Sequence, residues 1–296
     1  MPGFVAARWY AGVNDVAAAA AGADVLVIGF IDAAEIRHAI QAASTARWIS
    51  SHAAGVDHYP IDLLLQRGQV LTNGAGINAP PIAEFAVLCV LSAAKSFPTF
   101  VSASERHEWP AERPPADELE GSSALVIGYG EIGREIGKRL RPLGVQVSGV
   151  RRQASEEPGV IGPNDWRDRL AEFAYVIVSA ALTPETRHLL GAMEFARMHP
   201  RAWLFNVSRG GLVDHLALAE ALRARQLRGA YLDVTEPEPL PKSHPLWGMP
   251  NVVITGHSAG RSPRSQARYA ALLLDNLARF EHGEPLRNIV DLSAGY

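Results

Sequence analysis

Three polar side chains in the later part of the chain have the types that proton transfer on a small acid would require. They are Arg209, Glu238 and His257. An arginine can hold a carboxylate through two parallel N–H donors. A histidine can exchange a proton near pH 7, and a carboxylate beside it can orient the ring and favour its protonated form. Each alone is more often structural than catalytic, so the three matter only if the fold brings them together.

Each of these residues stands at or just after an apolar run that is typical of a buried strand. We expect strands over residues 202–207, 229–234 and 252–255. The segments that carry the polar groups are 206–211, 233–241 and 255–260. Ligands bind outside the carboxyl ends of the strands in open parallel sheets. We therefore expect the three segments to form one site.

A glycine-rich stretch at residues 124–140 indicates a second kind of site. An apolar strand is followed by a turn and by a helix with apolar side chains on one face. In this context G-x-G-x-x-G binds a dinucleotide: the first glycine allows the tight turn, the second a close approach of the pyrophosphate, and the third close packing of helix on strand. The helix N-terminus offers N–H groups to the phosphates. The predicted cofactor-binding residues of the turn are Gly128, Tyr129, Gly130, Glu131, Ile132 and Gly133.

The rest of the chain alternates strands and helices, so the predicted class is α/β. Residues 96–264 are expected to form a Rossmann doubly wound parallel sheet. Residues 1–95 and 265–296 are expected to form a smaller, discontinuous flavodoxin-like α/β domain that binds substrate, because a last helix at 263–282 follows the completed sheet. Further strands are expected at 24–30, 47–51, 70–72, 145–150 and 175–180. Helices are expected at 33–43, at 61–66, from 82 past 95 with a break or kink at Pro98, and at 165–173, 191–198 and 215–224.

The end of the second strand of the larger domain favours NADP over NAD as the cofactor. An acidic residue about 20 residues after the glycines usually binds the ribose 2′-hydroxyl of NAD. Here Arg151 and Arg152 stand at that place, and Glu156 and Glu157 come later in a loop. An arginine can pair with the 2′-phosphate of NADP. The alternative is that both arginines are solvated surface charges and that NAD is used.

Composition and charge exclude several other classes. The 296 residues carry a net charge of −3, so no basic face for nucleic acid is expected. The apolar run at 82–94 is too short to span a membrane and contains Glu84. Without a signal peptide, and with Cys89 as the one cysteine, the sequence predicts a cytoplasmic protein. No spacing of Cys, His and carboxylates indicates a metal site.

The sequence resembles the D-isomer-specific 2-hydroxyacid dehydrogenase family, and in particular its glyoxylate/hydroxypyruvate reductase-like members. Residues 198–260 carry the resemblance most strongly, with N-x-x-R-G, then D-V-x-x-x-E-P-L-P, then the late histidine. Thr183-Pro-Glu-Thr-Arg187 and Ala54-Gly-Val-Asp57 are similar to family segments as well. Departures are Gly256 and Ala181, where the family usually has proline, and Arg151, where it usually has an acidic residue.

The resemblance implies NAD(P)H-dependent reduction of a small 2-oxoacid of the glyoxylate or hydroxypyruvate type to the D-2-hydroxyacid. It implies that His257 is the proton donor, that Glu238 holds its ring, and that Arg209 binds the substrate. The remaining implied contacts are main-chain N–H groups of Ala54 and Gly55 to the substrate carboxylate, Asp233 to the nicotinamide carboxamide, and Thr183 near the cofactor. The resemblance also implies a homodimer. The three catalytic groups would meet over the nicotinamide between the two domains.

Two alternatives stay open at this stage. Nucleotide-sensing corepressors of the same family share the fold and the three catalytic residues, so a binding protein is the second hypothesis. The segment Gly256-His-Ser258-Ala-Gly260 also fits the nucleophile elbow of α/β-hydrolases, although few residues remain after it to supply the acid and the histidine. The sequence does not identify the 2-oxoacid, because side chains of the smaller domain and of residues 96–115 would select it.

Overall fold

The computed structural model describes residues 5–10, 12–29, 32–153 and 157–294. Within these ranges the chain divides into two units, one formed by the residues up to Asn78 and from Ser262 onward, the other by Ala79–Arg261. Phe30 and Glu156, which the sequence analysis placed at a strand end and in a loop, lie outside the described residues.

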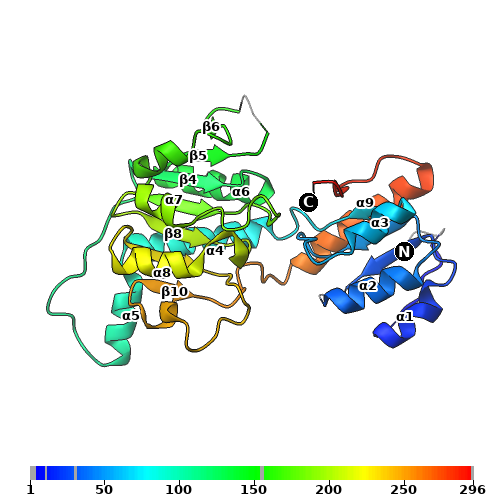
Figure 1. Cartoon of the computed structure of the whole chain (residues 1–296), viewed down its shortest axis with the longest axis horizontal. Helices are drawn as coiled ribbons and strands as arrows, with labels where there is room; N and C mark the ends of the chain where they lie inside the picture. Colours follow the sequence, from blue (N-terminus) through cyan, green and yellow to red (C-terminus); the bar gives the residue numbers. More distant parts are fainter. Residues whose placement is uncertain (1–4, 11, 30–31, 154–156, 295–296) are drawn as a thin grey trace. The chain divides into compact units, whose positions relative to one another are not determined.

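The larger unit is built on a seven-stranded sheet in which all neighbours pair in parallel (Figure 1). Its strands are β4 (Ser123–Ile127), β5 (Gln146–Val150), β6 (Val160–Ile161), β7 (Tyr175–Val178), β8 (Trp203–Asn206), β9 (Gly229–Leu232) and β10 (Val252–Ile254). The strand order is β10-β9-β8-β7-β4-β5-β6. From β4 the chain therefore adds β5 and then β6 on one side. It then returns to place β7 on the other side of β4 and adds β8, β9 and β10 beyond it. This is the doubly wound order, with its reversal between β4 and β7, and the predicted Rossmann fold is confirmed.

The register of this sheet brings the carboxyl ends of its strands level with one another. Ile127 pairs with Val150 on one side and with Val178 on the other. Val178 in turn pairs with Asn206, Asn206 with Leu232, and Leu232 with Ile254, so these residues form one row across the sheet. The glycine-rich turn, Arg151, Arg209, Asp233 and His257 all follow within a few residues of this row. The sheet thus places every predicted polar segment of the larger unit at one edge.

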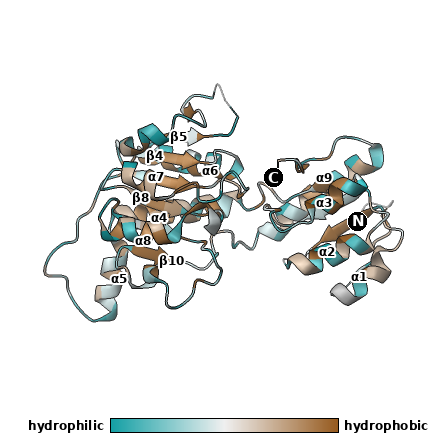
Figure 2. Ribbon diagram, in the orientation of Figure 1, coloured by the Kyte–Doolittle hydropathy of each residue, from teal (hydrophilic) through white to brown (hydrophobic). Residues whose placement is uncertain are grey.

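Helices cover both faces of the sheet, and its strands consist mostly of hydrophobic residues (Figure 2). Their buried side chains belong to two hydrophobic clusters, one on each face. On one face α4 (Ala79–Ala94) and α6 (Glu131–Leu140) pack against Ala124, Val126 and Phe205. On the other face α7 (Ala192–Arg197), α8 (His215–Arg223) and the 3₁₀ turn η2 (Arg167–Glu172) pack against Leu125 and Ile127. Since α4 completes a core of this sheet, the domain boundary predicted after residue 95 has to move to residue 78. The later boundary moves from 264 to 261.

The smaller unit has a three-stranded parallel sheet in the order β1-β2-β3. Its elements are α1 (Val13–Ala20), β1 (Val25–Ile28), α2 (Ala33–Ala42), β2 (Trp48–Ser51), α3 (Ile61–Arg67), β3 (Val70–Thr72) and α9 (Ser265–His282). The final helix joins this unit as expected: the Tyr269 hydroxyl lies 3.0 Å from Ser50 Oγ, and the Phe280 ring packs beside Trp48. The smaller unit is therefore discontinuous in sequence.

Several elements differ from the sequence expectations. The helix expected at 165–173 is the 3₁₀ turn η2, and α1 and β6 were not expected. The helical pattern expected from residue 82, with a break or kink at Pro98, forms two helices: α4 ends at Ala94 and α5 (Phe97–Glu105) begins after Ser96, so the break comes just before Pro98. Ser96 is left-handed, with φ 50°, and Pro98 lies in the first turn of α5. Proline suits a first helical turn but cannot continue an existing helix.

The same two helices bear on the membrane expectation. No single helix among the described residues is long and apolar enough to cross a membrane, whereas α4 and α5 are long and apolar enough only as a pair bent by 76°.

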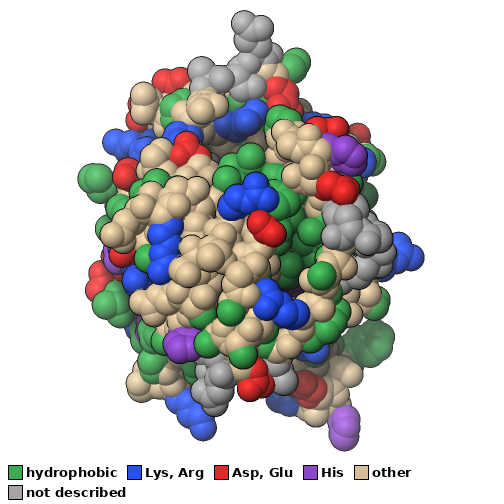
Figure 3. Space-filling model, turned by 90° about the vertical axis from the view of Figure 1, so that its right-hand side faces the viewer, with side chains coloured by type: hydrophobic (Ala, Val, Ile, Leu, Met, Phe, Trp, Pro, Cys, Tyr) green, Lys and Arg blue, Asp and Glu red, His purple; other side chains and the backbone are tan. Residues whose placement is uncertain are grey.

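On the face in Figure 3, the described basic and acidic side chains are interspersed with hydrophobic ones and do not gather into one basic area.

Candidate active site

The glycine-rich turn has the geometry that the sequence predicted. Gly128 has φ 94°, and a Cβ there would lie 2.3 Å from the main-chain nitrogen of Ala180. A Cβ on Gly133 would lie 2.5 Å from the carbonyl oxygen of Gly128, so the helix packs directly on the turn. A Cβ on Gly130 would meet no described atom within 4 Å. This open side of Gly130, at the N-terminus of α6, is suited to a phosphate group, so the residues present fit a dinucleotide.

The side chain of Tyr129, a predicted cofactor-binding residue, packs inside the larger unit. Its ring is buried and packs on Gly149, and its hydroxyl accepts a 2.8 Å hydrogen bond from Arg141. Its main-chain N–H donates to the carbonyl of Val150. A large aromatic side chain is stabilised in this apolar position, where glycine at 149 leaves the space. Tyr129 therefore supports the turn from inside, and the first N–H groups of α6, at Glu131 and Ile132, are the ones without an acceptor inside the helix.

The two arginines after β5 have different surroundings. Arg152 is exposed and lies near Glu185. The pKa of the Glu185 carboxyl is lowered, mainly by a 2.7 Å hydrogen bond from the Thr183 hydroxyl and less by the charge of Arg152. Arg151 is half-buried and forms no ion pair within the ranges that the structure describes. Of the two, Arg151 has the guanidinium with fewer competing partners for a phosphate.

Thr183 lies in the loop that follows β7, on the same edge of the sheet. Its main-chain N–H donates to the hydroxyl of Thr186 at 2.7 Å, and its carbonyl accepts from the main-chain N–H of Arg187 at 3.1 Å. The Thr183-Pro-Glu-Thr-Arg187 segment is thus a closed turn held by its own threonines. The start of the same loop borders the glycine-rich turn, since the Ser179 hydroxyl donates to the carbonyl of Gly128 at 2.9 Å.

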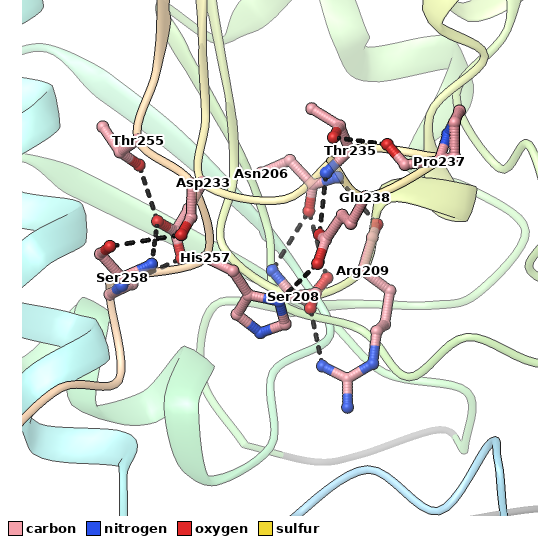
Figure 4. A network of polar contacts seen from close by, with 12 residues as sticks. Asn206, Ser208, Arg209, Asp233, Thr235, Pro237, Glu238, Thr255, His257 and Ser258 are labelled. Carbon is pink, nitrogen blue, oxygen red and sulfur yellow. Dashed lines mark hydrogen bonds and ion pairs between the residues drawn. The ribbon is translucent and has the colours of Figure 1, made fainter. Parts of the chain in front are cut away.

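The loop after β8 presents Arg209. Asn206, which is fully buried, donates through Nδ2 to the carbonyl of Arg209 at 2.9 Å and accepts from the main-chain N–H of Ser208 at 3.2 Å. These two bonds close the loop onto the strand end. The Arg209 guanidinium donates to the carbonyl of Ser208 at 2.8 Å, and the side chain is half-buried. In Figure 4 it extends from the strand ends on the same side as the ring of His257.

Glu238 and His257, from two different loops, form a hydrogen-bonded pair. Glu238 Oε2 lies 2.8 Å from His257 Nδ1, and Glu238 Oε1 accepts from the main-chain N–H of Thr235 at 3.1 Å (Figure 4). The side chains of His257 and Glu238 are 52% and 39% exposed, so the outer part of the ring is open. With Nδ1 held by the carboxylate, Nε2 is the nitrogen left to exchange a proton with a ligand. The structure therefore brings two of the three predicted catalytic groups into direct contact.

Asp233 holds the loop that carries His257. Its carboxylate is buried and accepts from the Thr255 hydroxyl at 2.6 Å and from the main-chain N–H groups of Ser258 at 2.8 Å and Ala259 at 3.0 Å. Its carbonyl accepts from the main-chain N–H of His257. His257 has φ 55° and follows Gly256 with φ 64°. Asp233 is therefore an anchor of this left-handed turn, whatever further contact it makes.

The turn geometry argues against the nucleophile-elbow alternative. In α/β-hydrolases the serine itself occupies the strained residue of the turn. Here His257 has the positive φ, and the Ser258 hydroxyl donates to the carbonyl of Gly256 at 3.3 Å. The neighbouring imidazole is turned to Glu238 instead of to the serine. Ser258 is thus not placed as an activated nucleophile.

The smaller unit carries the predicted substrate loop. Ala54 is exposed and Gly55 half-buried, and neither main-chain N–H donates a hydrogen bond within the described part of the chain. The carbonyl of Ala54 accepts from the Asn73 side chain at 2.7 Å, which fixes the loop to the end of β3. Two adjacent N–H groups on a fixed loop are suited to an anion. Among the described residues no group of three or more His, Cys, Asp or Glu side chains is placed to hold a metal.

Glu236, His215 and Gly210 lie around the Glu238 loop and were not singled out by the sequence analysis. Glu236 pairs with Arg187 at 2.6 Å, and its main-chain N–H donates to the buried ring of His215 at 3.4 Å. A histidine on the apolar side of a predicted helix is usually a core residue, so the pattern gave no reason to connect it with a loop that follows another strand. Gly210 offered the available signal, because a glycine beside Arg209 suggests a close approach of another backbone.

A doubly wound sheet with a dinucleotide turn, and an imidazole–carboxylate pair on the same edge, defines a class: the nucleotide-dependent oxidoreductases of the α/β type. Comparison with known families identifies the family within it. Residues 87–259 match the model of "D-isomer specific 2-hydroxyacid dehydrogenase, NAD binding domain". The chain belongs to the D-isomer specific 2-hydroxyacid dehydrogenase family, as the sequence resemblance predicted.

Individual relatives agree with this assignment. A D-3-phosphoglycerate dehydrogenase of Methanocaldococcus jannaschii is 30% identical over 274 residues, which are 91% of this chain but 52% of that protein. The chain thus spans about half the length of that relative. A glyoxylate reductase/hydroxypyruvate reductase of Mus musculus is 31% identical, covering 92% of this chain and 85% of the relative. An NADPH-dependent glyoxylate/hydroxypyruvate reductase of Sinorhizobium meliloti, solved with NADP and sulfate, has a TM-score of 0.81 and 26% identity, covering 93% of this chain and 87% of that one.

Proposed function

We propose that this protein reduces a small 2-oxoacid of the glyoxylate or hydroxypyruvate type to the D-2-hydroxyacid with NAD(P)H. The observation that carries the proposal is the 2.8 Å contact between Glu238 and His257, at the edge of the sheet where the dinucleotide turn also lies. Hydride addition to a 2-oxo carbon requires a proton for the oxygen, and this pair can supply it. The relative from Mus musculus and the neighbour from Sinorhizobium meliloti, which are matched over most of their length, are named as glyoxylate/hydroxypyruvate reductases, and this supports the substrate class.

We propose the following roles for the side chains of the site. Arg209 binds the substrate carboxylate and the 2-oxo oxygen, which fixes the face of the carbonyl. His257 donates the proton from Nε2 to the carbonyl oxygen, because its Nδ1 is held by Glu238. Glu238 stabilises the imidazolium before transfer. The reduced nicotinamide, when bound, supplies the hydride. One hydride and one proton added to the 2-oxoacid give the 2-hydroxyacid.

Further binding contacts are proposed from both units. The main-chain N–H groups of Ala54 and Gly55 bind the substrate carboxylate. The free oxygen lone pairs of Asp233 accept from the nicotinamide carboxamide, and Thr183 lines the cofactor. Arg151 pairs with the 2′-phosphate of NADP, which makes NADP the preferred cofactor over NAD. The neighbour from Sinorhizobium meliloti is an NADPH-dependent enzyme, in line with this preference.

We also propose a homodimer that forms through the larger unit. Five apolar side chains of the neighbouring helices α4 and α5 are exposed, namely Leu88, Leu91, Phe97, Phe100 and Val101. Apolar surface of this kind often marks an interface. Light scattering after gel filtration should give twice the chain mass, and the double variant Leu88→Glu, Phe97→Glu should give the single mass. A wild-type monomer would contradict the dimer and leave the reaction untouched. The cytoplasmic location stays a prediction of the sequence.

A substrate panel tests the proposed reaction. Glyoxylate, hydroxypyruvate, pyruvate and phenylpyruvate are each supplied with NADPH and with NADH, and oxidation is followed at the nicotinamide absorption band. In the reverse direction 3-phosphoglycerate is supplied with NADP and NAD, because one relative is a D-3-phosphoglycerate dehydrogenase. The expected result is turnover of glyoxylate or hydroxypyruvate, fastest with NADPH, with the D-product by chiral chromatography. No turnover of any substrate would contradict the proposal and favour a nucleotide-binding protein without catalysis.

A further inference from the structure

A buried histidine lies beneath the loop that carries Glu238. His215 is the first residue of α8, directly after Asp214, whose carboxylate caps the helix by accepting from the N–H groups of Leu216 and Ala217. The His215 side chain is turned inward, and the residue is 6% exposed. Its Nδ1 accepts from the main-chain N–H of Glu236 at 3.4 Å. This contact connects the helix after β8 to the loop after β9.

The bond to His215 is next to the bond that fixes Glu238. The main-chain N–H of Thr235 donates to Glu238 Oε1, and the next N–H along the chain, that of Glu236, donates to His215. The backbone at this point is also in close contact with Gly210, where a Cβ would lie 2.0 Å from the Thr235 carbonyl carbon. The connection after β8, which carries Arg209, therefore holds the Glu238 loop at two points. One is steric, at Gly210, and the other is a hydrogen bond, at His215.

The surroundings of His215 favour its neutral form. Burial is the largest cause and lowers the pKa of the ring, and His244, whose ring centroid lies 6.3 Å away, lowers it further. The negative charges of Glu236 and Asp214 act in the opposite direction, but their effect is smaller than that of burial. Glu236 is itself paired with Arg187. Because Nδ1 accepts a hydrogen bond, the proton of the neutral ring is on Nε2, which has no hydrogen-bond partner among the described residues.

Protonation of this ring would remove its function as an acceptor. The second proton goes to Nδ1, which would then face the N–H of Glu236 as donor against donor. The imidazolium would also be buried without a hydrogen-bonded counter-ion, which is costly. Both effects release the loop at the amide next to the one that holds Glu238.

We propose that neutral His215 is a positioning residue for the catalytic pair: by accepting from Glu236 it fixes the loop that holds Glu238 against His257. This inference rests on the proposed function for its kinetic consequence, but not for its structural one. His215 does not touch the reacting atoms. Under this proposal its protonation still contributes to the fall in kcat on the acid side of the pH profile.

Two substitutions of His215 separate its role as a hydrogen-bond acceptor from its ability to gain a proton. In His215→Asn the amide Oδ1 stands at the same distance along the side chain as Nδ1 and can accept from Glu236, but it does not titrate. In His215→Leu no acceptor remains. We expect His215→Leu to lower kcat roughly ten- to hundredfold, the usual effect of a misplaced catalytic group, with little change in KM for the dinucleotide. We expect His215→Asn to restore most of kcat at neutral pH.

The pH dependence is measured as a ratio. The kcat of His215→Asn is divided by that of wild type at each pH, which cancels the pH effects of the groups that both enzymes share. This ratio should rise as the pH falls through the pKa of His215, which burial lowers below the ordinary value of 6.5, since only wild type loses the acceptor there. The control His244→Asn keeps His215 and should retain an acid-side fall like that of wild type. A flat ratio for His215→Asn, or wild-type kcat in His215→Leu, would overturn the proposal.

Hydrogen–deuterium exchange provides a test that does not need turnover. Peptides covering residues 233–241 should exchange faster in His215→Leu than in wild type, and His215→Asn should restore slow exchange. Should His215→Leu fail to fold, the exchange and the pH ratio of His215→Asn decide. If wild type reduces no 2-oxoacid, the proposed function fails, whereas the exchange result still supports or overturns the role of His215. Equal exchange in all three proteins would refute it.

Discussion

Glu238 Oε2 lies 2.8 Å from His257 Nδ1, although the two residues come from loops after different strands. Each is held by a separate contact: Glu238 accepts from the main-chain N–H of Thr235, and the main-chain N–H of His257 donates to the carbonyl of Asp233, whose carboxylate accepts from the next residue, Ser258. The pair is therefore fixed from both sides before any ligand binds. Fixed donors and charges contribute more to a transition state than groups that must first reorient.

The first prediction concerns this pair. His257→Ala should lower kcat by about 10²–10⁴, the usual effect of losing a general acid. Glu238→Gln keeps an acceptor for the ring but not the negative charge, so kcat should fall less than in His257→Ala, while KM for the dinucleotide stays the same. The exposed Glu220→Gln on α8 is the matched control and should behave as wild type. Initial rates of nicotinamide oxidation measure all three, and near-normal kcat in His257→Ala would show that another group donates the proton.

Asp233 leads to a prediction on stability as well as rate. Asp233→Ala removes the acceptor of two main-chain N–H groups and one hydroxyl in a buried place, and each unsatisfied buried donor costs about 1–3 kcal/mol. Thermal unfolding should show a lower Tm, and kcat should fall because the His257 turn loosens. Thr255→Val removes one of the three bonds and should have a smaller effect on both. An unchanged Tm in Asp233→Ala would mean that the turn is held by other contacts.

Substitutions at two glycines of the dinucleotide turn should separate an effect on stability from an effect on cofactor binding. Gly133→Ala places a Cβ 2.5 Å from the Gly128 carbonyl, so we expect a loss of about 1–3 kcal/mol from overpacking. Gly130→Ala meets no described atom within 4 Å, so its stability should stay close to that of wild type while NADPH affinity falls. Denaturant unfolding and a fluorescence titration with NADPH measure the two effects. The prediction is wrong if Gly130→Ala binds NADPH as tightly as wild type.

The dinucleotide turn could be predicted because its signals are local. An apolar strand, three glycines and an amphipathic helix follow one another directly, and each glycine stands where a side chain would be unfavourable for the turn, for the phosphate or for helix packing. The position of Tyr129 could not be predicted, because the motif does not say that Gly149 on the next strand leaves room for its ring. The local pattern thus predicts the path of the backbone in this turn, whereas the direction of the Tyr129 side chain depends on packing against another strand.

The contact between Glu238 and His257 required more than local pattern. It depends on β9 and β10 being neighbours and in register, which the segments suggested only through their shared place after strands. The assignment of α4 to the wrong domain has a similar cause. Its apolar residues surround most of the helix, so periodicity did not say which core it completes. Likewise the helical pattern around His215 indicated burial but not its bond to Glu236.

The cofactor preference gives a prediction at the end of β5. Arg151→Ala should raise KM for NADPH strongly and leave KM for NADH nearly unchanged, because only NADPH carries the 2′-phosphate. Arg152→Ala should have a smaller effect, since Arg152 also lies near Glu185. Arg223→Ala, an exposed arginine in the last turn of α8, is the control for general loss of positive charge. Steady-state kinetics with both nucleotides decide the matter, and equal changes for NADPH and NADH in Arg151→Ala would contradict an NADP preference.

The last prediction concerns stability in acid. Burial lowers the pKa of His215 below its ordinary value of 6.5. Between these two values the unfolded chain binds more protons than the folded one, so the free energy of unfolding falls as pH falls through this window. His215→Asn removes that contribution, and its unfolding free energy should therefore decrease less than that of wild type below pH 6.5. Urea unfolding at a series of pH values, followed by circular dichroism, measures both proteins. Parallel curves would mean that His215 titrates alike in the folded and unfolded states, and that the acid sensitivity of the Glu238 loop has another origin.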